Sequence, residues 1–123
     1  MTADQFRRLA LALPDTEERS HMAHPDFRVR NKIFATLGYP DTGWGMVRLS
    51  PEQQATIIRA DPDVFRPAAG AWGRNGSTLV QLANARVTQL RPILRQAYEN
   101  LISRESLKRA AVRDKAPGRP RVR

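Results

Sequence analysis

The sequence predicts an α+β domain, in which one mainly antiparallel sheet of about five or six strands is covered by an N-terminal, a middle and a C-terminal helix. The apolar residues of three separate segments recur at helical spacing, and two of these segments begin with the pattern of a capping box. Between them lie short runs rich in β-branched and aromatic residues, bounded by turn-forming residues. With 123 residues, 41% of them hydrophobic, the chain is long enough to bury one core, and we expect a single domain over residues 1–104.

The first helix is expected from Thr2 to Leu13. Thr2 and Gln5 have the spacing of a capping box, and the apolar residues that follow recur at i, i+3, i+4 and i+7. Pro14 ends the helix. Residues 15–18, which hold the acidic cluster of the chain, are assigned to no helix or strand.

A β-hairpin is expected next. Residues 27–29 and 33–37 have the composition of strands, and Arg30-Asn31 between them suits a tight turn because asparagine tolerates left-handed backbone geometry. A two-residue turn at this position would place Phe27 opposite Phe34.

A further strand over residues 44–49 is expected to run antiparallel to the preceding one, because the connection between them is short. The middle helix is predicted to begin at Pro51. Ser50 suits the N-cap, the proline suits the first helical position, and Gln53 completes a capping box. Asp61-Pro62 ends this helix.

Asn75-Gly76 predicts a second β-hairpin with a type I′ turn, because both central residues of that turn need positive φ. A short strand over residues 64–66 precedes the hairpin, and residues 77–82 form its return strand. In this arrangement Trp72 would stand opposite Leu79. Two interpretations of Trp72 are open: it contacts a ligand, or it packs into the core, which the high average burial of tryptophan favours.

The last helix is expected from Val87 to Arg104, with an apolar stripe along one side. Pro92 fits this helix only if it lies in the first turn. Residues 105–123 are polar and basic, and we expect them to form a mobile tail outside the domain.

The charge balance favours a polyanionic partner. The chain has 21 basic and 12 acidic residues, a formal net charge of +9, and residues 105–123 hold seven basic residues against two acidic ones. A basic excess of this size favours nucleic acid through counterion release. The alternative is that the tail only keeps the domain soluble.

Several functional classes find no support in the sequence. Without cysteine the chain has no disulfide and no thiolate zinc site, which is compatible with the cytoplasmic location that we expect. No apolar run has the length of a membrane span, so we expect no membrane partner.

His21 and His24 resemble a metal-ligand pair, but they precede Pro25 in extended chain, and we expect no metal. Phosphate loops, dinucleotide fingerprints and G-x-S-x-G are missing, so we expect neither a cofactor nor enzymatic activity.

Four short motifs are informative when taken together: His24-Pro25-x-Phe27-Arg28, Lys32-x-Phe34-Ala35, Asp61-Pro62-x-x-Phe65 and Trp72-Gly73. In this combination the chain resembles the MmcQ/YjbR family of small bacterial proteins from Thr2 to about Arg104. The resemblance implies a frataxin-like α+β arrangement. It also implies DNA binding through two β-wings, a double-wing arrangement proposed for that family.

Transferred onto this chain, the wings of the family would be the turns at residues 28–32 and 74–77. Ser77 departs from the family pattern, since members often carry a tryptophan there, and the departure removes an aromatic contact. No recognition helix is identifiable, so we expect non-specific contacts to DNA phosphates. The sequence does not give the oligomeric state, and we favour a monomer. The alternative is a module that binds a protein or an anionic ligand without catalysis. The candidate DNA-binding residues are Arg28, Arg30, Lys32, Arg66, Trp72, Arg74, Lys108 and Arg109.

Overall fold

The computed structural model describes residues 1–114 of the chain, with side chains described for residues 1–104. In chain order the elements are α1 (Ala3–Leu11), β1 (Thr16–His21), β2 (His24–Val29), β3 (Lys32–Leu37), β4 (Trp44–Arg48), α2 (Pro51–Ala60), β5 (Phe65–Pro67), α3 (Gly70–Arg74), β6 (Ser77–Gln81), the 3-10 turn η1 (Leu82–Asn84) and α4 (Val87–Asp114). The predicted α+β fold is confirmed, and β1 and α3 are additions to the predicted elements.

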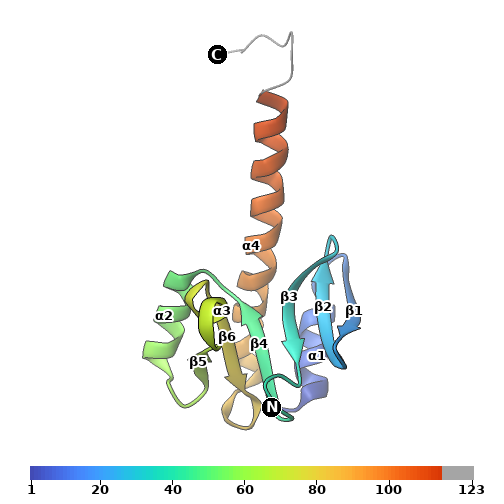
Figure 1. Cartoon of the computed structure of the whole chain (residues 1–123). Coiled ribbons are helices and arrows are strands. Elements are labelled where there is room, and N and C mark those ends of the chain that lie inside the picture. The colour runs from blue at the N-terminus through green and yellow to red at the C-terminus, as the bar shows by residue number, and fades with distance from the viewer. Residues whose placement is uncertain (115–123) are drawn as a thin grey trace.

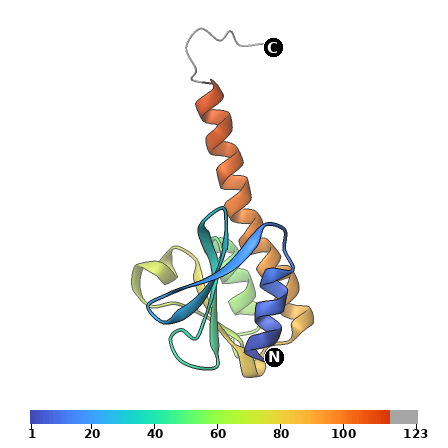
Figure 2. The same cartoon turned by 90° about the vertical axis from the view of Figure 1, so that its right-hand side faces the viewer.

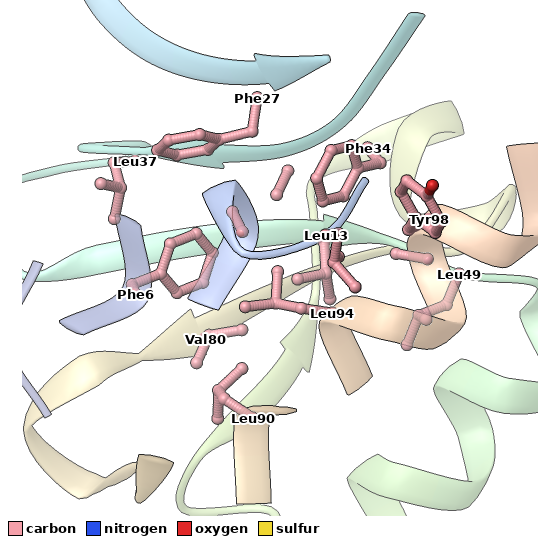
Figure 3. Packing of buried hydrophobic residues seen from close by; sticks show 14 of the residues in the cluster. Phe6, Leu13, Phe27, Phe34, Leu37, Leu49, Val80, Leu90, Leu94 and Tyr98 are labelled. Atoms are coloured by element: carbon pink, nitrogen blue, oxygen red, sulfur yellow. The ribbon is translucent and has the colours of Figure 1, made fainter. Parts of the chain in front are cut away.

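The six strands form one antiparallel sheet in the order β1-β2-β3-β4-β6-β5. Helix α1 and the first half of α4 lie against the same face of this sheet (Figure 1 and Figure 2). Between the helices and the sheet, Phe6 of α1, Phe27 and Phe34 of the sheet and Leu94 of α4 pack into one buried cluster (Figure 3). Helices α1 and α4 therefore cover one face of the sheet, and the opposite face is left for a site (Figure 1 and Figure 2).

Both predicted capping boxes are present. The Thr2 hydroxyl accepts a hydrogen bond from the Gln5 backbone N–H at 3.1 Å, and the Gln5 side chain accepts one from the Thr2 N–H at 2.9 Å. Ser50 and Gln53 exchange the same two bonds at the start of α2. Each box satisfies N–H groups that have no partner within the helix, which fixes where α1 and α2 begin.

Strand β1 was not predicted, and its position explains why. It lies at the edge of the sheet and pairs with β2, and none of its residues is buried. A strand without a buried side has no alternation of apolar and polar residues. Its charged composition therefore gives no strand signal.

The first predicted hairpin is confirmed, with a correction to its register. Arg30 and Asn31 at the turn have φ values of 52° and 65°, as a tight turn with left-handed residues requires. A β-bulge places Phe27 opposite Ala35, so the predicted pairing of Phe27 with Phe34 is wrong. The extra residue is Phe34, whose ring packs at 5.9 Å from that of Tyr98 in the core.

The second predicted hairpin is wrong: the segment before Asn75-Gly76 is the short helix α3. Asn75 has φ −90° and donates its N–H back to Ala71, as the residue after a helical turn does. β6 pairs instead with β4 and β5. Of the two interpretations of Trp72, packing in the core opposite Leu79, which we favoured, is wrong, because the side chain is 58% exposed.

Close backbone packing explains why local turn preference fails here. A Cβ on Gly73 would lie 1.8 Å from the Ala68 carbonyl oxygen, and one on Gly76 would lie 1.9 Å from the Leu49 carbonyl oxygen. Both glycines are therefore needed because other backbone segments pass next to them. Gly76 also has φ +109°, but it directs the chain from α3 into β6 rather than around a hairpin.

Helix α4 begins at the predicted residue and continues past the predicted end at Arg104 to Asp114. It extends well beyond the body of the domain (Figure 2). Pro92 lies inside the helix, so the condition that it stand in the first turn is not met. The predicted mobile tail lies outside the described residues from position 115 onward. Among the helices of the described part, none is both long and apolar enough to cross a membrane.

Candidate nucleic-acid interface

The face of the sheet opposite α1 and α4 carries a second, smaller apolar cluster. It is formed by Met46, Ala68 and Leu79, with Tyr39 and Trp44 packed against it. Side chains alternate along a strand, so residues two apart share a face. Arg48, two residues after Met46, and Ser77, two residues before Leu79, therefore belong to this open face.

A groove of about 430 Å³ opens where the end of β4 meets α2, α3 and α4. Arg48 and Arg104 approach it from β4 and α4, and among the described side chains its lining contains these two cations and no carboxylate. The remaining lining residues are Leu49, Ser50, Pro51, Trp72, Asn75, Ser77, Asn100, Leu101 and Ser103. We call this surface the arginine groove.

Both arginines of the groove are available to an anion. They are exposed, and no ion pair within residues 1–104 includes either of them. Guanidinium groups bind phosphate oxygens through charge-assisted hydrogen bonds, often in pairs. A groove lined by two such groups therefore suits a polyanion.

Buried and half-buried amides hold the walls of the arginine groove in place. The Gln54 side chain donates to the carbonyl oxygens of Gly73 and Ser77, both at 3.0 Å, which ties α2 to the end of α3. Asn100 of α4 donates to the Gln53 side chain at 2.8 Å, which ties α4 to the start of α2. The groove is therefore preformed.

A smaller pocket of about 210 Å³ adjoins the arginine groove over the open face of the sheet. It shares Arg48, Trp72 and Ser77 with the groove. Its other lining residues are His21, Ile33, Thr36 and Met46. We call it the sheet pocket. The exposed ring of Trp72 stands where the two hollows meet and lies 6.4 Å from the ring of Tyr39.

Asp26 on β2 is fully buried, and its carboxylate bonds to the side chains of Arg28 and His21 on the open face. Arg28 donates to both of its carboxylate oxygens, at 2.7 and 3.1 Å, and His21 Nδ1 lies 2.7 Å from Oδ2. The hydrogen bond from Arg28, assisted by His21, lowers the pKa of Asp26 although burial acts in the opposite direction. The carboxylate is therefore ionised near neutral pH.

This ion pair changes the expected role of Arg28. The guanidinium that we predicted at the wing already has a carboxylate partner on the sheet face. His21 is likewise bonded to Asp26, and its ring lies 6.4 Å from that of His24. The two histidines are thus part of the sheet surface.

The other predicted contact residues are dispersed. Arg30 is exposed at the β2–β3 turn, and Lys32 after it is half-buried. Arg66 lies over the ring of Trp44 at 4.3 Å, an arrangement typical of a cation–π interaction. Arg74 is exposed at the end of α3. The side chains of Lys108 and Arg109 lie outside the described part of the chain.

Of the predicted residues with described side chains, Trp72 alone lines the arginine groove, and Arg48 and Arg104 were not predicted as site residues. The signal for Arg48 was present, because alternation from Trp44 through Met46 places it on the non-core face of its strand. Arg104 carries no such signal. It reaches the groove only because α4 crosses the end of the sheet.

A six-stranded antiparallel sheet, with α1 and α4 over one face and a groove lined by two arginines at the end of β4, defines a small α+β protein of the kind that the sequence motifs indicated. The YjbR family model matches residues 11–100, and the chain belongs to the YjbR family. Its fold is similar to that of the Deinococcus radiodurans protein DR2400, whose crystal structure is described with a DUF419 domain. The TM-score is 0.66 and the sequence identity is 19%, and the match covers 79% of this chain and 75% of that chain. No curated protein matches the chain.

Proposed function

We propose that this YjbR-family protein binds nucleic acid non-specifically, with the phosphate backbone held in the arginine groove. The observation that carries the proposal is the convergence of Arg48 and Arg104 on a preformed groove whose described lining holds no carboxylate. Trp72 at the rim offers an aromatic surface next to these cations. The net charge of +9 supplies the long-range attraction.

The surroundings of the groove extend the same surface. The register of β3 and β4 places the start of β3 beside the end of β4, so the β2–β3 turn with Arg30 lies at the same end of the sheet as Arg48. Helix α4 projects from this end (Figure 1). A phosphate backbone in the groove would therefore run near the hairpin turn and along α4, where the basic residues beyond Arg104 add attraction.

Removing both groove arginines is expected to weaken duplex DNA binding about tenfold and to reduce the slope of log K against log salt by about two, one unit for each lost phosphate contact. The measurement is fluorescence anisotropy of a labelled duplex over a salt series, comparing wild type with the Arg48→Ala/Arg104→Ala double variant. The matched control is Arg59→Ala/Arg95→Ala, which removes the same charge from exposed helix positions outside the groove. It should leave the slope unchanged.

Equal losses in the two double variants would show that only net charge matters and would contradict a groove-specific contact. Absence of binding at low salt would remove the nucleic-acid proposal. In that case, inorganic pyrophosphate binding that depends on Arg48 and Arg104 would favour the alternative of an anionic-ligand module.

A further inference from the structure

Thr36 carries a polar group that the fold leaves without a partner. The side chain is 1% exposed, and its Oγ1 has no hydrogen bond within the described part of the chain. Buried hydroxyl groups are normally hydrogen-bonded, so each exception requires an explanation. Thr36 lies on β3 and lines the sheet pocket, so its side chain belongs to the wall that a bound molecule would meet.

The sheet pocket has the size and walls for one flat ring system. An engineered cavity of about 150 Å³ holds benzene, and this pocket measures about 210 Å³. Ile33, Met46 and Trp72 supply apolar and aromatic walls. Aromatic side chains stack on nucleobases regardless of sequence, because each base has a π-face.

The polar groups of the pocket are suited to the edge of a heterocycle and to an attached anion. Asp26 is ionised and accepts hydrogen bonds only, so His21 donates to it from Nδ1–H, and Nε2 is the nitrogen left for a ligand. Arg48 belongs to both the sheet pocket and the arginine groove. A ring in the pocket would thus have its phosphate on the groove side.

We propose that the sheet pocket receives one unpaired nucleobase, whose ring stacks against Trp72, whose edge bonds the Thr36 hydroxyl, and whose phosphate binds Arg48. The choice of ligand rests on the proposed function. The base–phosphate unit comes either from a single strand lying in the groove or from a free mononucleotide.

The test compares four probes by anisotropy or tryptophan fluorescence: a labelled oligothymidylate, the same strand with abasic sites, a duplex, and free thymidine monophosphate. The strand with bases should bind wild type about tenfold more tightly than the abasic strand. Thr36→Val should abolish most of this ratio, because valine keeps the shape and lacks the hydroxyl. Thr56→Val, the same change on the exposed side of α2, is the matched control and should preserve the ratio.

Trp72→Ala should also abolish the preference for bases, and Trp72→Phe should restore most of it, since phenylalanine still offers a ring for stacking. Trp72 is largely exposed, so neither change should lower the melting temperature much. Thr36→Val should melt at or above the wild-type temperature, because it removes an unpaired buried hydroxyl.

Equal binding of the base-containing and abasic strands would overturn the pocket proposal, and unchanged duplex binding in the same experiment would leave the proposed function standing. A base preference that Thr36→Val does not alter would also overturn it, with the hydroxyl then bound to water. Thr36-dependent binding of the mononucleotide without any DNA binding would uphold the pocket and remove the proposed function.

Discussion

Replacing Gly76 by alanine is expected to destabilise the fold by at least about 3 kcal/mol. Two causes act together. The residue has φ +109°, which an L side chain rarely adopts, and its Cβ would lie 1.9 Å from the Leu49 carbonyl oxygen. Backbone cannot move aside as a flexible side chain does. Urea unfolding followed by circular dichroism measures the loss.

Gly70→Ala separates the two causes. Gly70 also has positive φ, +64°, but apart from its chain neighbours and its own helix backbone no described atom lies within 4 Å of the position that an alanine methyl group would take. This variant should lose only about 1 kcal/mol, the cost of left-handed backbone in alanine. Similar losses of unfolding free energy in the two variants would contradict the close approach of Gly76 to Leu49. They would instead favour the hairpin that the local turn preference predicts.

Asp26→Asn is expected to lower the free energy of unfolding by about 2–4 kcal/mol at pH 7. The amide cannot neutralise Arg28, and it replaces a carboxylate that accepts bonds from two side chains. Asp63→Asn is the matched control, since Asp63 is exposed and its carboxylate has no bond within the described side chains. That change should stay within about 0.5 kcal/mol.

The loss at Asp26 should depend on pH in a defined direction. The pKa of Asp26 is lower in the folded protein than its ordinary value of 3.8, so the folded state favours the ionised form. The resulting stabilisation is fully present above the ordinary pKa and disappears as pH falls from there through the folded pKa. The difference between wild type and Asp26→Asn should therefore shrink below about pH 4. A difference that is constant from pH 7 to pH 2 would contradict an ionised, paired Asp26.

The elements that the sequence predicted correctly depend on local chemistry. Thr2 with Gln5 and Ser50 with Gln53 cap helices through bonds within four residues, so pattern and structure agree. The predictions that were wrong concern segments whose structure is decided by contacts with residues far away in the sequence. Gly76 has the sequence context of a hairpin turn, but its role is decided by Leu49, which lies far from it in sequence.

The candidate site was predictable only in part. Asp26 and Arg28 lie two apart, where residues of one strand share a face, so their ion pair had a local signal that competes with a role for Arg28 at the wing. Trp72 was identified as a possible contact from its place beside the predicted hairpin turn and from the Trp72-Gly73 motif. Predicting the arginine groove requires knowing how β4 and α4 lie relative to each other, and no local sequence pattern contains this information.

The most direct test of the groove as the nucleic-acid surface is a ¹H–¹⁵N NMR titration of the full chain with DNA. We expect the largest shifts at the backbone of Arg48, Ser77 and Arg104 and at the indole N–H of Trp72, with much smaller shifts at Trp44. Shifts confined to the β2–β3 turn, or to residues 115–123, would contradict the account and place binding at the hairpin wing or at the basic tail.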